Sequence, residues 1–227
     1  MKKYAVEAIG TFFLVLTIGL CVLEPTAGPF APLAIAAVLL GMIYAGVHIS
    51  GAHYNPAVTL AVWMRGRCEA TDIPGYIAAQ LVGSALAAGV ALYLKGFPEV
   101  TAMTPDVGPA LLAEFLFTFA LVWVILNTAT AKGTEGNSFY GAAIAFTVLA
   151  GVYAVGDVSG AAFNPAVAVG ITILGLSSIQ NIWIFLVANF LGAAAAALAS
   201  VTVRRSLLSI GSTQCSGAKS SAESSWW

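Results

Sequence analysis

The chain has 227 residues, of which 59% are hydrophobic and 8% are charged, and its mean hydropathy is +0.92. A soluble domain carries about 25% charged residues, so this balance indicates that the lipid bilayer is its main solvent. The net charge of −1 offers no basic surface for nucleic acid. The contexts of Cys21, Cys68 and Cys215 are unrelated, so we expect no disulfide framework, metal site or cofactor.

Six long apolar runs follow one another along the chain, each near the ~20 residues that cross ~30 Å of hydrocarbon as a helix. They predict membrane spans at 5–23, 31–48, 73–94, 108–130, 138–156 and 179–203. The first run contains Glu7 and has no clean small-residue cleavage site, so we expect a retained span rather than a signal peptide.

Two shorter apolar segments, 55–65 and 164–174, lie between long runs and begin with Asn-Pro. Asn is a strong N-cap and Pro is tolerated at the first helical position, so each segment is predicted to start a helix. Both segments are too short to cross a bilayer. They predict re-entrant half-helices, which are tolerated where they are buried in protein or line a wet cavity.

The two half-helices belong to an internal repeat. The segment SGAHYNPAV at 50–58 recurs as SGAAFNPAV at 159–167. The matches continue at the same spacing, with Tyr76, Gln80 and Gly83 corresponding to Phe185, Asn189 and Gly192. Each half then holds three spans, an odd number, so the second half must have inverted topology. We predict an all-α membrane fold with a first repeat at 1–96, an extracellular linker at 97–107, a second repeat at 108–205 and a mobile, Ser-rich cytoplasmic tail at 206–227.

Basic residues support this arrangement. If the N-terminus is cytoplasmic, Lys95 is the one of the nine Lys and Arg residues that falls outside. This bias towards the inside predicts six spans with both termini in the cytoplasm. We expect an integral membrane protein of the plasma membrane.

The inverted topology brings the tips of the half-helices, Asn55-Pro56-Ala57 and Asn164-Pro165-Ala166, together near the middle of the membrane. Helix N-termini have unpaired amides and about half a positive charge. If the Asn oxygens cap the helices, their amide N–H groups are free to donate to a passing water. Such a water directs both hydrogens away, so a water file relays protons poorly there, and the positive ends disfavour cations. These residues are predicted to form the central constriction of a pore.

At this point the sequence resembles the aquaporin and glycerol-facilitator family of membrane channels. The resemblance covers about residues 4–203 and rests on Glu7–Val15, His48–Thr59, Gln80, Glu114-Phe115 and the second Asn-Pro-Ala. It implies a right-handed bundle in the lipid bilayer, with one pore per subunit for water and small neutral solutes, no enzymatic activity and usually four identical subunits.

The resemblance also implies roles for individual residues. It makes Asn55 and Asn164 the central donors and places His48 at the cytoplasmic pore entrance. Four further residues support the re-entrant loops: the carboxyl groups accept hydrogen bonds from loop amides, and the glycines allow close approach. These are Glu7, Glu114, Gly51 and Gly160.

The selectivity filter departs from the family pattern. The family's second motif normally continues with Arg, where this chain has Val167. The other filter positions, counted from the two Asn residues, are Ile35, Val152 and Ala161. Water-selective members often have an aromatic, a His and a small residue there, and glycerol-selective ones two aromatics and a Gly. The residue after Val167 is Ala168 rather than the Asp common in glycerol facilitators. Without the Arg side chain the constriction is wider. However, an apolar constriction offers water no hydrogen bonds, so the free energy for water to enter it is higher.

We therefore expect a wide, weakly selective pore for water and small neutral solutes. The alternatives are a facilitator of glycerol, ammonia or hydrogen peroxide with little water flux, and an alternating-access transporter. A membrane enzyme and a closed adhesion protein are two further alternatives. Some family members have Cys where Ala161 stands, so mercury block through that position is expected to be absent.

Overall fold

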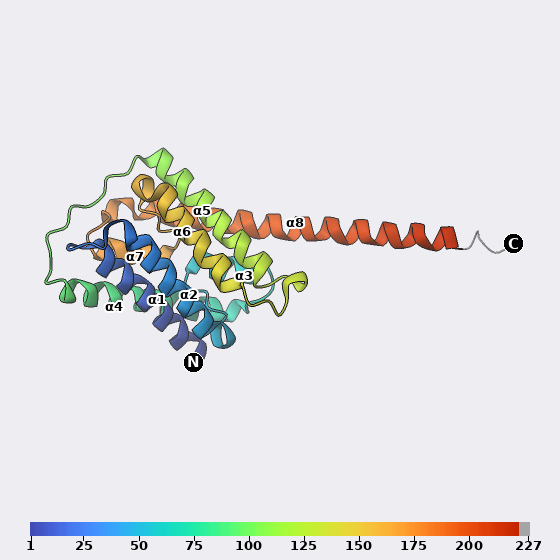
Figure 1. Ribbon diagram of the computed structural model, residues 1–227, viewed down its shortest axis with the longest axis horizontal. Helices are drawn as coiled ribbons and strands as arrows, with labels where there is room; N and C mark the ends of the chain where they lie inside the picture. The colour runs from blue at the N-terminus through green and yellow to red at the C-terminus, as the bar shows by residue number, and fades with distance from the viewer. Residues whose placement is uncertain (223–227) are drawn as a thin grey trace.

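The computed structural model describes the backbone of residues 1–222 and the side chains of residues 1–203. Within that part the chain is helical, with short 3-10 turns between the helices and no named strand (Figure 1). The α-helices are α1 Lys2–Val22, α2 Ala31–Ser50, α3 Pro56–Met64, α4 Ile73–Leu94, α5 Val107–Thr128, α6 Tyr140–Ser159, α7 Pro165–Ile173 and α8 Ile182–Ala222.

All six predicted spans are present as helices long and apolar enough to cross a membrane. The predicted 73–94 coincides with α4, and the other starts differ by three residues or fewer. Helices α2 and α6 run two and three residues past the predicted ends. They stop where Gly51 and Gly160 adopt the left-handed conformation, with φ of 86° and 89°. Glycine is favoured there because a side chain resists positive φ. The expected close approach is not the reason at Gly160, where an added Cβ would have its nearest neighbour at 3.9 Å.

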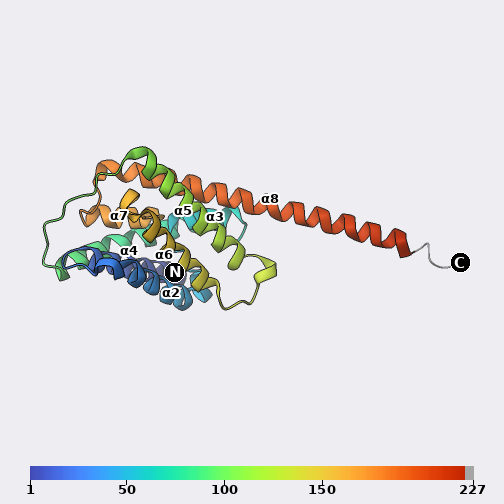
Figure 2. The ribbon, with the colours of Figure 1, turned by 45° about the horizontal axis from the view of Figure 1, so that its top comes forward.

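The half-helices α3 and α7 lie inside the bundle (Figure 2). The long helices pack around them in two similar sets, with α4 against α1 and α8 against α5. Gly83 on α4 lies against the backbone of Ala8, and Gly192 on α8 lies against the backbone of Phe115 in the same way. The repeat that the sequence shows is therefore a repeat of helix packing.

The connector between the repeats is bound to the second one. The amide of Met103 donates to the carbonyl of Leu176, just after α7, at 3.0 Å. At the opposite end of the bundle, α8 continues to Ala222 (Figure 1). This differs from the tail expected at 206–227. No Pro follows residue 165 to stop the helix. The side chains beyond residue 203 and the whole of residues 223–227 lie outside the described part of the chain, so the expected mobility of the tail stays a prediction.

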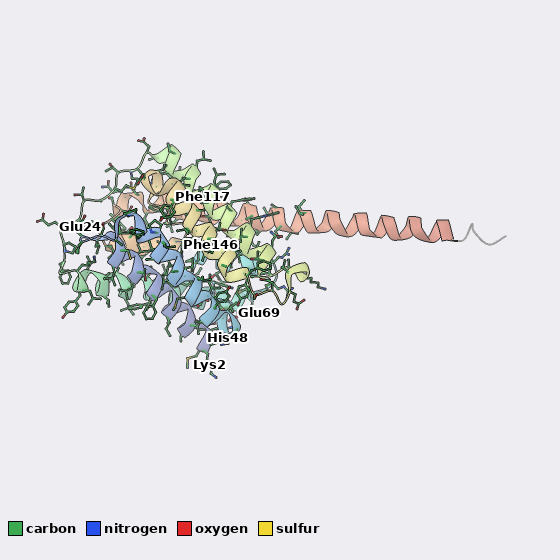
Figure 3. The ribbon with its side chains drawn as sticks, viewed as in Figure 1. Lys2, Glu24, His48, Glu69, Phe117 and Phe146 are labelled. Atoms are coloured by element: carbon green, nitrogen blue, oxygen red, sulfur yellow. The ribbon has the colours of Figure 1, made fainter. Side chains whose placement is uncertain are left out.

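Charged and polar side chains mark the two ends of the bundle. Lys2, His48 and Glu69 lie toward the end that holds the N-terminus, and Glu24 lies toward the other end (Figure 3). Lys3 forms an ion pair with Asp72 on the N-terminal side. Between the ends, large apolar side chains on the outer faces of the helices are exposed, such as Leu86, Leu116 and Phe146. This pattern fits a bundle surrounded by lipid.

Candidate functional site

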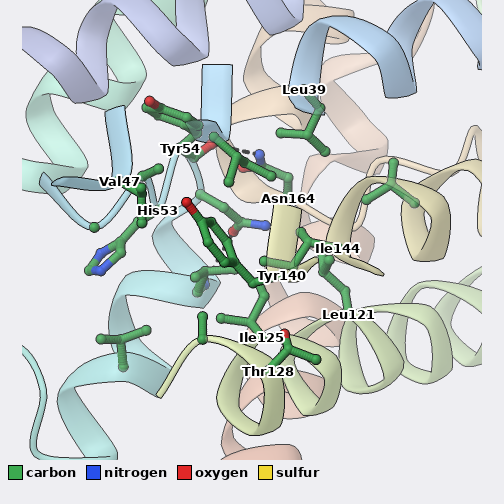
Figure 4. Close-up of a pocket in the computed structure, with 18 of the residues that line it drawn as sticks. Leu39, Val47, His53, Tyr54, Leu121, Ile125, Thr128, Tyr140, Ile144 and Asn164 are labelled. Atoms are coloured by element: carbon green, nitrogen blue, oxygen red, sulfur yellow. Dashed lines mark hydrogen bonds between the residues drawn. The ribbon is translucent and has the colours of Figure 1, made fainter. Parts of the chain in front are cut away.

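One cavity of about 900 Å³ passes the tips of both half-helices. Its mouth on the N-terminal side, the amino-terminal mouth, is lined by His48, Arg67, Glu69, Lys132 and Glu135. At the other end, the apolar mouth is lined by Ile18, Val22, Ile35, Val152 and Val167. Asn55 and Asn164 line the cavity between the mouths, so the structure brings both predicted central residues to one passage. Figure 4 shows Asn164 at this passage.

Both Asn side chains cap their half-helices as the sequence predicts. The Oδ1 atom of Asn55 accepts from the amides of Ala57 and Val58, at 2.9 and 3.4 Å. The Oδ1 atom of Asn164 accepts from the amides of Ala166 and Val167 at the same two distances. The oxygens therefore point into the half-helices, which leaves the Nδ2 atoms as the donors of each side chain.

Each Asn also bonds to the opposite re-entrant loop. Nδ2 of Asn55 donates to the carbonyl of Phe163 at 2.9 Å, and Nδ2 of Asn164 donates to the carbonyl of Tyr54 at 2.8 Å. An amide nitrogen carries two hydrogens. We expected both N–H groups of each Asn to be free, and this is wrong for one of the two. One hydrogen of each side-chain amide bonds to the opposite loop, and the other is left to donate into the passage.

Glu7 holds the first re-entrant loop. Its carboxylate is fully buried and accepts the amides of His53 at 2.9 Å and Tyr54 at 2.6 Å. The hydroxyl of Ser50 and the side-chain amide of Gln80 add two more bonds, at 2.7 and 2.8 Å. A carboxylate inside a membrane needs such internal partners.

Glu114 repeats this arrangement in the second half. It accepts the amides of Ala162 and Phe163 at 2.9 and 2.7 Å, together with Ser159 and Asn189, both at 2.8 Å. Both glutamates therefore fix the backbone just before an Asn-Pro-Ala tip, as the family resemblance implies.

The halves differ beside these carboxylates. In the first half His53 is buried, and its Nδ1 lies 3.1 Å from the hydroxyl of Thr59, which also accepts from Gln80 at 3.1 Å. The corresponding positions in the second half are Ala162 and Ala168, and Asn189 bonds to Thr118 instead. The first loop thus has a polar connection that the second lacks.

The side chains of Tyr54 and Phe163 anchor the loops from the other direction. Both residues have positive φ, of 49° and 47°. The Tyr54 ring lies against Gly10 and Gly46, and its hydroxyl donates to the carbonyl of Met42 at 2.8 Å. The Phe163 ring lies against Gly151. A side chain larger than hydrogen at these glycines would collide with the rings, so the glycines set the position of the tips.

The four predicted filter positions all line the cavity. Ile35, Ala161 and Val167 are buried and Val152 is partly buried. Two of them continue apolar stripes along the passage at four-residue spacing, which makes successive side chains neighbours on the helix surface. The stripe on α2 is Ile35, Leu39, Ile43 and Val47, and the stripe on α6 leads from Val152 through Val148 and Ile144 to Tyr140.

Tyr140 and Cys68 are two of the cavity residues that were not among the predicted site residues. Tyr140 projects into the passage near Ile125 and Ile144 (Figure 4). The four-residue steps from Val152 through Val148 and Ile144 to Tyr140 were the available signal. Cys68, for which the sequence predicts no site, lines the amino-terminal mouth near Arg67 and Glu69. Burial, with the Asp72 carboxylate nearby, raises the pKa of the Cys68 thiol above its ordinary value.

Comparison with known proteins agrees with this geometry. Residues 1–200 match the family model described as Major intrinsic protein. The chain is 35% identical to Aquaporin NIP1-1 of Oryza sativa subsp. japonica, over 90% of this chain and 75% of the relative. It is also 35% identical to Nodulin-26 of Glycine max, over 87% of this chain and 76% of the relative. The solved aquaglyceroporin of Plasmodium falciparum superposes with a TM-score of 0.74 at 20% identity, over 87% of this chain and 93% of that one, which is a likeness of fold.

Proposed function

Because the chain belongs to the major intrinsic protein family and is thus a membrane channel for water and small neutral solutes, we propose that its pore is wide and weakly selective. The membership also makes it a channel and not an enzyme. The proposal concerns what the pore admits and what it excludes.

The composition of the apolar mouth carries the proposal. At the filter positions Ile35, Val152, Ala161 and Val167 the cavity meets no charged side chain and no side-chain hydrogen-bond donor. A long Arg at position 167 would occupy the passage and repel cations, and Val167 does neither. A neutral solute therefore meets a wider opening, with discrimination by size rather than by charge.

The proposed barrier to protons and cations lies at the half-helix tips. The N-termini of α3 and α7 both point at the passage, and each has a positive dipole end. One N–H of Asn55 and one of Asn164 remain to donate to a passing water. Such a water accepts from both, and its hydrogens point away from the tips, which interrupts a proton relay.

The membrane arrangement belongs to the same proposal. Lys2, Lys3, Arg67 and Lys132 lie at the end with the N-terminus, which supports cytoplasmic termini. Exposed apolar side chains along the spans are compatible with lipid and with a homotetramer. Glu7 and Glu114 already accept four bonds each, so they offer no open coupling-ion site, and this favours passive flux over alternating access.

Stopped-flow light scattering on proteoliposomes tests the proposal. The wild-type protein is expected to carry both water and glycerol faster than empty liposomes. Val167→Arg should lower glycerol flux more than water flux, because it narrows the passage and adds a charge. Val167→Met is the control for side-chain length without charge. Wild-type permeability equal to that of empty liposomes for water, glycerol, ammonia and hydrogen peroxide would refute the wide pore.

A second candidate is a solute facilitator with little water flux. The apolar stripes on α2 and α6 favour it, because water loses hydrogen bonds in a hydrophobic passage and such a passage can dewet. The ratio of water to glycerol permeability in the same proteoliposomes separates the candidates. Water permeability near that of empty liposomes, together with glycerol or hydrogen peroxide permeability above that of empty liposomes, identifies the facilitator.

A further inference from the structure

The hydroxyl groups along the cavity are almost all engaged. Six hydroxyl-bearing residues that line it donate to a protein acceptor: Ser50, Tyr54, Tyr76, Thr128, Thr130 and Thr134. Tyr140 is the seventh, and among the described residues its hydroxyl has no hydrogen-bond partner. A phenol hydroxyl can both donate and accept. Tyr140 therefore brings an unused polar group into the passage.

Tyr140 lies well away from the filter. It is the first residue of α6 and lines the cavity in one slanting row with Ile144, Val148 and Val152, which turns by about 120° around the helix. The twelve residues from Val152 correspond to ~18 Å along a helix. In Figure 4 its ring extends into the pocket, with the hydroxyl toward the side on which Val47 and His53 lie. The half-helix tips thus lie between this ring and the apolar filter.

The local structure fixes the position of the Tyr140 ring. Asn137 Oδ1 accepts from the Tyr140 amide at 2.8 Å, and Asn137 Nδ2 donates to the carbonyl of Thr128 at 2.7 Å. The ring meets Tyr44 edge to face, with the centroids 5.3 Å apart. The hydroxyl of Tyr44 donates to the carbonyl of Ser138 at 2.7 Å. The loop before α6 and the ring on α2 together hold Tyr140 in place.

We propose that Tyr140 is a second selectivity residue, which acts in the half of the pore on the N-terminal side. Its ring limits the width of the passage there, and its hydroxyl exchanges a hydrogen bond with the passing solute. The solutes that benefit are small neutral molecules with several hydroxyl groups, since they lose most water in the apolar stretch. The inference rests on the proposed wide filter, because a narrow filter would make a second constriction irrelevant.

Two substitutions separate the hydroxyl from the ring. Tyr140→Phe removes the hydroxyl alone, and we expect glycerol permeability relative to water to fall roughly two- to tenfold, the range that one neutral hydrogen bond supports. Tyr140→Ala removes the ring as well and should admit a larger polyol, such as erythritol, which the wild type retards. Phe146→Ala is the matched control, since this aromatic lies on the same helix and is 58% exposed on the outer face.

The outcomes are distinct. Unchanged glycerol-to-water ratios in Tyr140→Phe, with unchanged erythritol flux in Tyr140→Ala, would overturn the proposal. Loss of both effects when Val167→Arg is added supports it, because the filter then becomes limiting. The glycerol and water permeabilities of Val167→Arg alone test the proposed filter separately from Tyr140.

Thiol labelling tests the placement of Tyr140 without any flux. In a background with Cys21, Cys68 and Cys215 replaced by Ser, Tyr140→Cys should react with a charged methanethiosulfonate, and glycerol should slow the reaction. Phe146→Cys should stay unreactive in the bilayer. An unreactive Tyr140→Cys would contradict the proposal even if the wild type proved impermeable, so this failure is separate from a failure of the wide pore.

Discussion

The side-chain amides of Asn55 and Asn164 join the two halves of the channel, since each donates to the loop that carries the other, at 2.9 and 2.8 Å. Each tip is therefore positioned partly by the opposite repeat. One hydrogen of each side-chain amide is used in this bond, and the second is left to donate to a solute in the pore.

Asn164→Asp should weaken both the bond between the two half-helix tips and the barrier to protons in the pore. The carboxylate can still cap α7, but it cannot donate to the Tyr54 carbonyl, and it places a negative charge at a point that the dipoles keep positive. We expect proton leak to rise above the wild-type level, measured with a pH-sensitive dye inside proteoliposomes under a potassium diffusion potential. Asn127→Asp, outside the cavity, is the control. An Asn164→Asp channel as proton-tight as the wild type would argue against this barrier.

Glu7→Gln and Glu114→Gln should destabilise the protein to a similar degree. Each carboxylate accepts from four donors, and an amide NH₂ in place of one oxygen would face two of them. The expected cost is about 1–3 kcal/mol, the range for a buried polar group left without its partner. Thermal unfolding in detergent measures it, with the exposed Glu99→Gln as control. Unequal losses would show that the two loops are not held equivalently.

Gly46→Ala and Gly41→Ala should change stability in opposite directions. A Cβ at Gly46 would collide with the Tyr54 hydroxyl, and overpacking of this kind costs about 1–3 kcal/mol. A Cβ at Gly41, on the same helix, meets nothing within 4 Å, so alanine should stabilise by about 0.5–1 kcal/mol. Melting temperatures of the two variants test the difference. Water flux should fall in Gly46→Ala, because Tyr54 positions the first tip.

Mercury should not block the wild-type pore at Ala161, and Ala161→Cys should create that block, because residue 161 lines the cavity at the filter. Water flux before and after mercuric chloride, with recovery by a thiol reductant, is the measurement. Cys68 lines the opposite mouth, so any residual inhibition of the wild type is expected to vanish in Cys68→Ser. Inhibition that survives replacement of Cys21 and Cys68 would contradict the assignment.

Labelling of Cys68 should depend on pH in a shifted range. Burial raises the pKa of this thiol, so less thiolate, the reactive form, is present at neutral pH. The rate with N-ethylmaleimide should be slow at pH 7 and should still rise with pH above ~8.5, the pKa of an ordinary cysteine. The rate is measured with Cys21 and Cys215 replaced by Ser. A plateau at or below the ordinary pKa would show that the thiol is not shielded.

The helices could be predicted from the sequence because their signals are local. The lengths of the apolar runs predict the six spans. The two Asn-Pro pairs predict the first residues of α3 and α7, Pro56 and Pro165. The roles of Glu7 and Glu114 followed from family resemblance. The bond from Asn55 to Phe163 could not be predicted, because it joins positions 108 residues apart through a backbone carbonyl. The rings of Tyr54 and Phe163 lie against glycines on other helices, which again requires the assembled bundle.

Tyr140 shows a different limit of sequence reasoning. The sequence predicts this span at 138–156, but twelve residues turn an ideal helix by about 120°, so placing Val152 at the filter does not by itself bring Tyr140 into the passage. In the folded bundle the stripe through Val148 and Ile144 connects the two residues along the cavity.

That stripe makes the length of α6 part of the channel's specificity. Tyr140 and Val152 lie twelve residues apart on one continuous helix and about 120° apart around its axis, so the number of residues between them sets which part of the passage each one lines. A single residue inserted between them would turn one relative to the other by about 100° and move it 1.5 Å along the axis. Insertions in α6 therefore act as selectivity mutations without altering either side chain, whereas insertions in the connector at 97–107 leave both in place.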